Sequence, residues 1–337
     1  MRWLITGGCG FIGTSLVRAL AAEGGHRIRV VDNFAAGTRQ DLAQVTAFDE
    51  IDSAAIKPMD KAAGDVVDLI EGDVVDGPLM FKAAAGADVI VHLAACTGVE
   101  PSVEDPALDC TVNVFGTLNT LEAARHNKVQ RFVFASSGAP IGECEPPIHE
   151  ELPAHPVSPY GASKLAGEGY CSAYYWSFGV DTVVLRFGSV YGPCAGRETS
   201  VVATFIRSAL AGKKLEIFGD GQQTRDFIFN EDLVRALRLA ATVPDIGGET
   251  FQIASSAETT VGELVEKLLP ALGEAGVPPA EVRHTAPRVG DVQRNFSDTT
   301  KARDLLGWRS EVRLSDGLRR TVTWFVEQSR KSASTAA

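Results

Sequence analysis

The sequence predicts an α/β protein with a Rossmann-type, doubly wound parallel sheet and a smaller, mixed α/β C-terminal lobe. Three observations predict this architecture. Through the first half of the chain, short β-rich runs alternate with helical patterns, as in parallel sheets with helices on both faces. A glycine-rich turn, GGCGFIG, stands between the first run and the first helical pattern. After Val190 the rhythm changes to short mixed elements with many Gly and Pro residues.

The individual elements of the sheet follow from local patterns. The expected strands are the apolar runs Trp3–Thr6, Ile28–Val31, Asp68–Glu71, Val89–His92, Arg131–Ala135 and Thr182–Arg186. The expected helices have apolar residues at helical spacing and cover Phe11–Ala22, Ala107–His126, Pro159–Phe178 and Asp316–Gln328. The segment Asp41–Asp65 is longer than a usual connection and has no motif, so we expect a surface insertion there.

Composition excludes several classes of function. The 337 residues are 45% apolar, which suffices for a large core, and the net charge of −11 argues against nucleic acid or an anionic membrane as partner. No apolar stretch reaches the ~20 residues needed to cross a bilayer, and no signal peptide is evident, so a cytoplasmic protein is expected. The six cysteines form no CxxC pair and are expected to be reduced thiols. No HxH or HxxxH pair is present, so no metal site is expected.

The glycine-rich turn predicts a dinucleotide site. Gly7, Gly10 and Gly13 permit a tight turn and let backbone N–H groups approach a diphosphate at the helix N-terminus. Asp32 ends the second strand, where a carboxylate accepts hydrogen bonds from the ribose hydroxyls and repels a 2′-phosphate, which favours NAD over NADP. Asp73 follows the third strand and either meets the adenine amino group or serves the turn. The other residues expected to contact the cofactor are Phe11, Ile12, Asn33, Val74, Leu93, Ala94, Ala95, Asn113 and Ser136.

The sequence SPYGASK predicts the residues that carry out the reaction. Tyr160 and Lys164 are four residues apart and share one helical face. A lysine ammonium and a positive nicotinamide both favour the phenolate, so we expect the pKa of Tyr160 to fall below its usual value of ~10, making it a general base. Ser137, at the end of a buried strand, is expected to hydrogen-bond the same substrate hydroxyl, while Ser136 faces the cofactor.

Asn113 lies in the middle of an expected helix, where Asn is a poor helix former. Two interpretations stay open at this point. The amide either orients a backbone group or water near Lys164, or it is a buried structural amide.

These motifs together resemble the extended short-chain dehydrogenases/reductases of the nucleotide-sugar epimerase/dehydratase branch, and the UDP-glucose 4-epimerases most closely. The resemblance runs almost end to end, and the motifs that carry it are GGCGFIG, SPYGASK, LRFGSVYGP, FGDGQQTRDFIFNEDLVRA and RVGDVQRNFSDTTKARDLLGW. It implies tightly bound NAD, a catalytic set of Ser137, Tyr160 and Lys164, and a nucleotide-diphospho-sugar in the cleft between two lobes. Arg225, Arg288 and Asp291 become the diphosphate and ribose contacts, and guanidinium groups suit phosphate oxygens.

The resemblance also implies an organisation and a partner. We expect an NAD-binding domain at residues 1–180, with segments returning from about 220–255, a nucleotide-sugar-binding lobe at 181–330 and a disordered tail at 331–337. We also expect a homodimer built from the helices Ala107–His126 and Pro159–Phe178. Both helices carry apolar residues beyond one stripe, among them Leu108, Val112, Leu165, Tyr174 and Trp176.

The end of the fifth strand separates two reactions of this branch. Related 4,6-dehydratases usually have Thr-Asp-Glu there, which supplies an acid and a base for loss of water. This chain has Ser137, Gly138 and Ala139. Because neither Gly nor Ala can move a proton, the expected reaction is 4-epimerisation: oxidation at C4, turning of the keto sugar and reduction on its other face.

Five positions bear on the sugar. Pro140-Ile141 stands where Val-Tyr is usual, and Ser189 where Asn commonly contacts the substrate. Ser189 resembles the uronic acid epimerases, but Glu100 stands where those usually carry a carboxylate-binding Arg, so we place a neutral hexose ahead of a uronate. Two interpretations of Asn295 stay open: it is small enough to leave room for an N-acetyl group beside C2, or it satisfies a nearby backbone group.

The expected function is therefore NAD-dependent 4-epimerisation of a nucleotide-diphospho-sugar, UDP-glucose or UDP-galactose and also their N-acetylhexosamine forms. The alternatives are a UDP-glucuronate 4-epimerase, a nucleotide-sugar reductase or dehydrogenase with exchangeable NAD, and a non-catalytic NAD-binding scaffold. The intact Ser137, Tyr160 and Lys164 argue against the scaffold.

Overall fold

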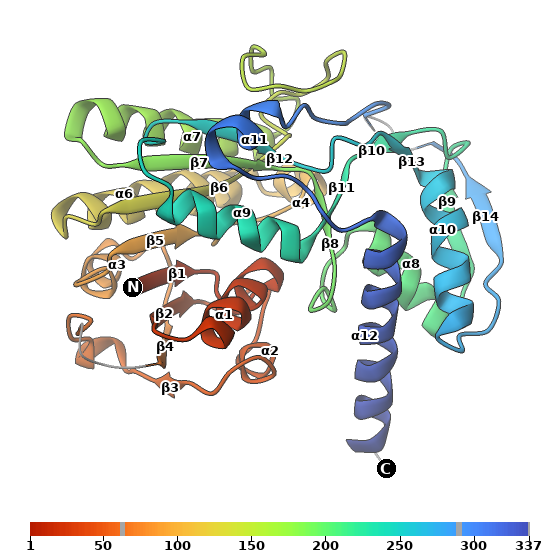
Figure 1. Cartoon of the computed structure of the whole chain (residues 1–337), viewed down its shortest axis with the longest axis horizontal. Helices are drawn as coiled ribbons and strands as arrows, with labels where there is room; N and C mark the ends of the chain where they lie inside the picture. Colours follow the sequence, from red (N-terminus) through yellow and green to blue (C-terminus); the bar gives the residue numbers. More distant parts are fainter. Residues whose placement is uncertain (61–64, 288–291, 336–337) are drawn as a thin grey trace.

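A central sheet of eight parallel strands organises the protein, in the order β12-β7-β6-β5-β1-β2-β4-β3 (Figure 1). The computed structural model describes residues 1–60, 65–287 and 292–335. The strands are β1 (Arg2–Thr6), β2 (Arg27–Asp32), β3 (Asp49–Glu50), β4 (Val66–Glu71), β5 (Val89–His92), β6 (Arg131–Ser137), β7 (Thr182–Phe187) and β12 (Thr250–Ile253). The Rossmann-type fold class predicted from the sequence is confirmed.

Both faces of this sheet are buried, because alternate strand residues enter different hydrophobic clusters. Trp3 and Ile5 of β1 belong to one hydrophobic cluster, whereas Leu4 belongs to another on the opposite face. The register places Ile5 between Val30 of β2 and Val91 of β5. The first face is covered by α1 (Phe11–Glu23) and α9 (Asn230–Thr242), and the second by α3 (Gly77–Ala83), α6 (Gly116–His126) and α7 (Pro159–Phe178).

The strand order reverses at β1. The chain passes from β1 to β2 and β4 on one side and then returns to β5, β6 and β7 on the other. Loops leaving β1 and β5 therefore diverge at their C-terminal ends and leave a crevice, which is where open parallel sheets bind ligands.

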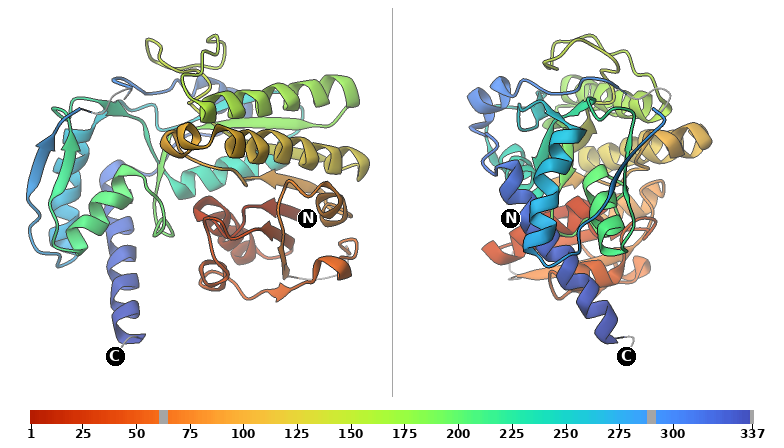
Figure 2. Two further views of the ribbon diagram at one scale, coloured as in Figure 1. Left: turned by 180° about the vertical axis from the view of Figure 1, so that it is seen from behind. Right: turned by 90° about the vertical axis from the view of Figure 1, so that its right-hand side faces the viewer.

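A smaller mixed lobe follows β7 and lies beside the carboxyl ends of the strands (Figures 1 and 2). It has its own apolar cluster, which Phe11 of α1 joins. Its pairs are β8 with β11 and β9 with β14, both parallel, and β10 with β13, antiparallel. The elements are β8 (Ser189–Tyr191), α8 (Val201–Leu210), β9 (Leu215–Phe218), β10 (Thr224–Arg225), β11 (Phe227–Phe229), β13 (Thr259–Thr260), α10 (Val261–Glu274), β14 (Val282–Thr285) and α12 (Leu314–Thr335). The remaining helix, α11 (Thr300–Leu306), packs back against α9 and against β12 of the central sheet.

Several element boundaries differ from those expected. The predicted helix Ala107–His126 is three pieces: α5 (Pro106–Cys110), a π-helical turn η2 (Thr111–Phe115) and α6. The last helix reaches Thr335 instead of ending at Gln328, so the predicted disordered tail 331–337 is helical as far as the structure describes it; its sequence contains no Gly or Pro that would end the helix. Helix α7 has the predicted bounds. The division into two domains stays a prediction.

The segment 41–65 is more than a surface insertion. Besides the short α2 (Arg39–Ala43) and η1 (Ser53–Ala55), it supplies β3, which pairs with β4 at the edge of the sheet. Met59 is buried, and the Lys57 carbonyl accepts a hydrogen bond from the buried guanidinium of Arg29 at 2.9 Å. The segment therefore supplies the edge strand of the sheet, and this edge is short and acidic, which discourages pairing with other chains.

His92, the last residue of β5, links strand β1 to helix α6 next to the crevice. One ring nitrogen is 2.8 Å from Thr6 Oγ1 of β1 and the other is 3.1 Å from Thr117 Oγ1 of α6. The ring stacks on Phe134. Burial, with a smaller contribution from the Lys164 charge, lowers the pKa of His92 to about 3.

This histidine should make stability fall in weak acid. Because its folded pKa lies below the unfolded value of ~6.5, the contribution of neutral His92 is complete above that pH and is lost as pH falls toward 3. When the pH falls from about 7.5 to about 5.5, we expect the loss of this contribution to lower the free energy of unfolding, measured with urea, by about 1 kcal/mol. The His92→Gln variant should lose less over the same interval. Equal losses in both proteins would show that His92 does not titrate this way.

Candidate active site

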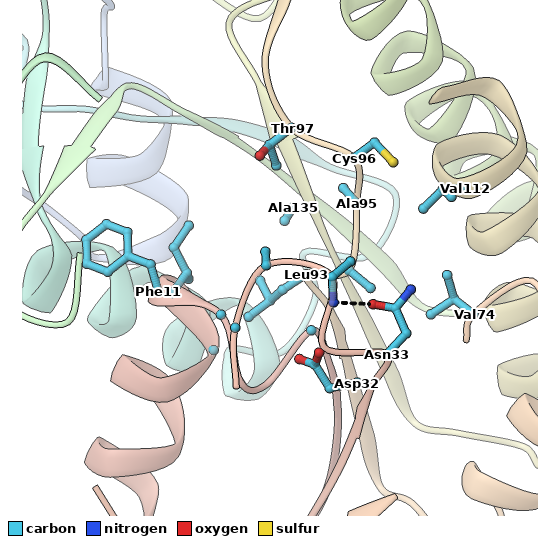
Figure 3. Close-up of a pocket in the computed structure, with 18 of the residues that line it drawn as sticks. Phe11, Asp32, Asn33, Val74, Leu93, Ala95, Cys96, Thr97, Val112 and Ala135 are labelled. Atoms are coloured by element: carbon cyan, nitrogen blue, oxygen red, sulfur yellow. Dashed lines mark hydrogen bonds between the residues drawn. The ribbon is translucent and has the colours of Figure 1, made fainter. Parts of the chain in front are cut away.

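A cavity of about 460 Å³ opens in the crevice at the carboxyl ends of β1, β2, β5 and β6 (Figure 3). It runs from the glycine turn after β1 to the inner face of α7. Of the residues predicted to bind the cofactor, all but Asn113 line it: Gly7, Gly10, Phe11, Ile12, Gly13, Asp32, Asn33, Asp73, Val74, Leu93, Ala94, Ala95, Ser136, Tyr160 and Lys164. Ser137 lines it as well.

The glycine turn has no space for side chains. Gly7 has a φ of +68°, and a Cβ there would lie 2.8 Å from the Ala94 nitrogen. A Cβ on Gly13 would lie 2.3 Å from the Gly7 carbonyl oxygen. Gly10 is the N-cap of α1 and offers no side-chain acceptor to the first-turn N–H groups. These groups have no partner within the helix, so this end of α1 suits a diphosphate.

Asp32 is held in a fixed orientation at the end of β2. The Cys9 N–H donates to its Oδ2 and the Phe34 N–H to its Oδ1, both at 2.8 Å. Burial raises its pKa, while these two hydrogen bonds act in the opposite direction. A carboxylate has about four acceptor sites, so both oxygens can also accept from a ribose diol. Nearby, Asn33 Nδ2 donates to Asp73 Oδ2 at 2.9 Å. The cradle and the acid together fit NAD.

The opposite end of the cavity is formed by β6 and α7. Ser158 is the N-cap of α7 and accepts from the Gly161 N–H at 3.1 Å, which fixes the start of the helix before Tyr160. Lys164, four residues on, is only 4% exposed and donates from Nζ to the Ala135 carbonyl at 2.9 Å. The Nζ atom is 6.0 Å from the centre of the Tyr160 ring. Ser137 hydrogen-bonds the Tyr160 side chain.

The pKa of Tyr160 differs from the expectation based on the sequence. Burial raises the pKa of Tyr160 above its ordinary value, and the carboxylates of Asp109 and Glu198 add to this, while the Ser137 hydrogen bond opposes it. Burial also lowers the pKa of Lys164 to about 8, against the fields of Asp109 and Glu168. The expected lowering of the Tyr160 pKa is therefore wrong for the protein alone, because burial of the phenol dominates.

Two predicted cofactor residues have other hydrogen-bond partners. The Ser136 hydroxyl, expected to face the cofactor, donates to Glu168 Oε1 at 2.5 Å, and Arg186 forms a two-pronged ion pair with the same carboxylate. Asn113 does not line the cavity. Its Oδ1 accepts from the Cys96 N–H at 2.8 Å and its Nδ2 donates to the Cys96 carbonyl at 3.0 Å. Asn113 is thus a buried amide that hydrogen-bonds the Cys96 backbone, and a role toward Lys164 stays a prediction.

Ser189 and Arg225, two of the predicted substrate residues, do not line the cavity. Ser189 sits in β8 between Gly188 and Val190, which do line the cavity. Arg225 Nη1 donates to the Thr224 and Val292 carbonyls, both at 2.7 Å. Arg288 and Asp291 fall outside the described residues.

Asn295 lies next to the catalytic strand end. A Cβ on Gly138 would be 4.0 Å from Asn295 Nδ2, so this amide stands beside the turn that follows Ser137. A second cavity, of about 690 Å³, lies in the smaller lobe. It is lined by Phe218, Gly219, Asp220, Gln223, His284, Thr285, Pro287 and Gln293.

Glu198 is the main site residue that the sequence did not reveal. It lines the cavity from the loop after β8, and burial raises its pKa against the attraction of Arg207. Nothing in the motif GPCAGRETS signals this position, because a loop residue has no periodicity. Glu100, expected to face the sugar, is instead exposed on α4 (Val99–Glu104) and does not line the cavity. Cys96 and Thr97, also missed, lie four and five residues after the end of β5 and could have been included by extending the strand-end rule.

Other expectations concern the chain as a whole. All six cysteines are free, as expected. Among the residues that the structure describes, no group of three or more His, Cys, Asp or Glu side chains could hold a metal ion. No helix within those same residues is long and apolar enough to cross a membrane.

Comparison with known proteins identifies the family. Residues 3–254 match the model of the NAD-dependent epimerase/dehydratase family. The chain belongs to this family. A UDP-glucose 4-epimerase from Mycolicibacterium smegmatis is 37% identical over 335 residues, covering 98% of this chain and all of that protein. Membership in the family makes NAD the cofactor that the glycine turn and Asp32 serve.

Two solved structures of family members are closely similar. The UDP-glucose 4-epimerase of Thermotoga maritima with UDP-glucose has a TM-score of 0.83 and 33% identity, covering 98% of this chain and all of that one. The UDP-glucuronic acid 4-epimerase of Bacillus cereus, in complex with UDP-glucuronic acid and NAD, has a TM-score of 0.83 and 29% identity, again over 98% and 100% of the two chains. The family relationship thus leaves the sugar open.

Proposed function

We propose that this protein is a nucleotide-sugar 4-epimerase that uses NAD to interconvert UDP-glucose and UDP-galactose. The observation that carries the proposal is the strand end Ser137-Gly138-Ala139 beside Tyr160. Loss of water from a keto sugar needs an acid and a base next to the oxidised carbon, and Gly138 and Ala139 can supply neither. Removal and return of hydrogen at one carbon needs a single base, which Tyr160 provides.

Each chain residue then has one task. Tyr160 takes the proton of the C4 hydroxyl and later returns it, and Ser137 donates a hydrogen bond that holds the same oxygen in place. Lys164 keeps a positive charge beneath the phenol. When bound, NAD supplies the hydride acceptor and donor, and its positive nicotinamide ring favours the phenolate form of Tyr160. That charge offsets the burial that raises the pKa of Tyr160 in the protein alone.

Charge supports a neutral sugar over a uronate. Glu198 lines the cavity and acts electrostatically on Tyr160, so its carboxylate lies on the catalytic side. A sugar carboxylate there would face a like charge in a poorly solvated site. The second cavity, with Phe218 and Gln223 in its wall, offers a ring and an amide for a nucleotide base.

The proposal is tested with a panel of UDP-sugars and no added NAD, followed by product analysis. Interconversion of UDP-glucose and UDP-galactose is the expected result. Turnover that requires added NAD and yields a stable keto product would instead identify a dehydrogenase. Conversion of UDP-glucuronate alone would exclude the neutral hexose.

Replacing Tyr160 with Phe removes the proton acceptor and leaves the cavity shape nearly unchanged. We expect the Tyr160→Phe variant to lose turnover by about 10²–10⁴-fold, the usual contribution of a general base. NAD content, measured after denaturing the purified protein, should match that of the native protein. Tyr170→Phe, an exposed tyrosine of the same helix, is the matched control and should leave turnover unchanged. A near-normal rate in Tyr160→Phe would refute the catalytic assignment.

The small Asn295 leads to a prediction about pocket width. Because its amide stands beside Gly138 and leaves space there, we expect UDP-N-acetylglucosamine to be turned over alongside UDP-glucose. Asn295→Tyr should suppress the acetylated substrate selectively, whereas Asn295→Ala should retain both. Both rates are measured under the same conditions. If the native protein converts UDP-glucose and ignores UDP-N-acetylglucosamine, Asn295 does not set the width of the pocket.

Exposed apolar side chains on α5 and α7 support a homodimer. Leu108 is 52% exposed and Trp176 is 80% exposed, although Tyr174, expected on the same surface, is buried within its own chain. We expect a dimer in sedimentation at micromolar concentration, and Trp176→Glu should convert it to a monomer by placing a charge in the contact. Leu305→Glu, on the exposed part of α11, is the control. A native monomer at that concentration would contradict the prediction.

A further inference from the structure

A buried cluster of polar side chains lies behind the catalytic helix, where α5 and η2 pack against α7. Its centre is the Asn113 side chain. The two N–H groups of its Nδ2 atom are shared among the Cys96 carbonyl, Asp109 Oδ2 and Ser163 Oγ, each 3.0 Å away. Ser163 in turn donates to the Tyr160 carbonyl at 3.1 Å. With its two hydrogen bonds to Cys96, Asn113 joins three segments that border the cavity.

Asp109 is the unexplained member of this cluster. Its side chain is 2% exposed, and its Oδ1 atom has no hydrogen-bond donor among the residues that the structure describes. Burial of a carboxylate without full hydrogen bonding is costly. A structural link to Asn113 does not require a charge, because a neutral amide could accept the same hydrogen bond. The negative charge of Asp109 therefore calls for a separate reason.

The groups around Asp109 provide that reason. Two of these groups lie on α7: Asp109 raises the pKa of Lys164, for which it is the largest favourable charge, and the pKa of Tyr160. A third group, Cys96, lies on the loop after β5, and Asp109 raises its pKa as well.

Other carboxylates also raise the pKa values of these three groups. Glu168 acts on Lys164, Glu198 acts on Tyr160, and both Asp73 and Asp105 act on Cys96. Of all these carboxylates, Asp109 alone acts on both Lys164 and Tyr160.

We propose that Asp109 is a positioning residue for the reaction: its buried negative charge keeps Lys164 positive, and its contact with Asn113 seats α7 against the loop after β5. Asp109 touches neither substrate nor cofactor in this arrangement and acts through Lys164 and Tyr160. The inference rests on the proposed function only in that Tyr160 is the base.

The charge of Asp109 predicts the direction in which the pH–rate profile shifts when that charge is removed. Turnover requires Tyr160 to lose its proton and Lys164 to keep its own, so the acidic limb follows the first group and the alkaline limb the second. Asp109 raises the pKa of both. Removing its charge lowers both pKa values, so the whole bell-shaped profile moves to lower pH. A merely structural role would reduce the rate and leave both limbs in place.

The test compares three variants of the full-length enzyme with its bound cofactor. Asp109→Asn has the same shape and can still accept from Asn113, and both of its limbs should move to lower pH. Asp109→Glu restores the charge and should keep both limbs near their native positions, even if the rate falls. Glu104→Gln removes one charge from the exposed surface of α4 and should leave the profile unchanged. If the amide variant does not fold, the smaller Asp109→Ser serves the same comparison.

A second measurement does not depend on turnover. The near-ultraviolet absorbance of tyrosinate is titrated in the native protein and in Asp109→Asn, and each curve is corrected with the corresponding Tyr160→Phe variant. The Tyr160 step should appear at lower pH in Asp109→Asn. If the step moves but no nucleotide sugar is converted, the proposed function fails and the inference about Asp109 stands. If sugars are converted and neither the limbs nor the Tyr160 step move, the inference is wrong.

Discussion

The site depends on keeping one ammonium group charged inside the protein. Lys164 is almost fully buried, and its ammonium donates a hydrogen bond to the Ala135 carbonyl. Burial alone would neutralise such a group, and it lowers the pKa of Lys164 to about 8. Asp109 and Glu168 counteract this from two sides, at the cost of burying two carboxylates. The surrounding polar contacts follow from this constraint, since each of these acids needs partners of its own: Asn113 for one, Arg186 and Ser136 for the other.

The sheet explains why these groups meet. Strand order reverses at β1, so the glycine turn after β1 and the end of β6 border the same crevice. Helix α7 packs across β6 with Gly167 against the ring of Phe134, where a Cβ would lie 2.4 Å from the ring. This close approach brings the face of α7 that carries Tyr160 and Lys164 down onto the end of β6. A parallel sheet buried on both faces thus supplies the low-dielectric surroundings in which fixed charges act strongly.

Sequence reasoning succeeded where a function is encoded locally. The glycine turn, Asp32 and the four-residue spacing of Tyr160 and Lys164 are short-range patterns, and all of these residues line one cavity. It failed where the outcome depends on burial or on distant segments. The π-helical turn at Thr111–Phe115 interrupts a continuous apolar pattern, and the direction of the Tyr160 pKa is decided by burial, which no motif records. Glu198 reaches the cavity from a loop, where neither spacing nor periodicity gives a signal.

The same contrast separates the reaction from the substrate. Chemistry at the sugar carbon is decided within one rigid strand end and one helix, where Ser137, Gly138 and Tyr160 leave a single group able to move a proton. In the proposed reaction, the sugar meets side chains that follow β8 or precede α11: Glu198, which lines the cavity, and Asn295, which lies beside Gly138. Loops tolerate substitution more readily than buried strands do. One fold can therefore serve different sugars when the strand end is shared and the loop residues vary. This chain is structurally similar to both a UDP-glucose and a UDP-glucuronic acid 4-epimerase, so individual side chains decide the substrate.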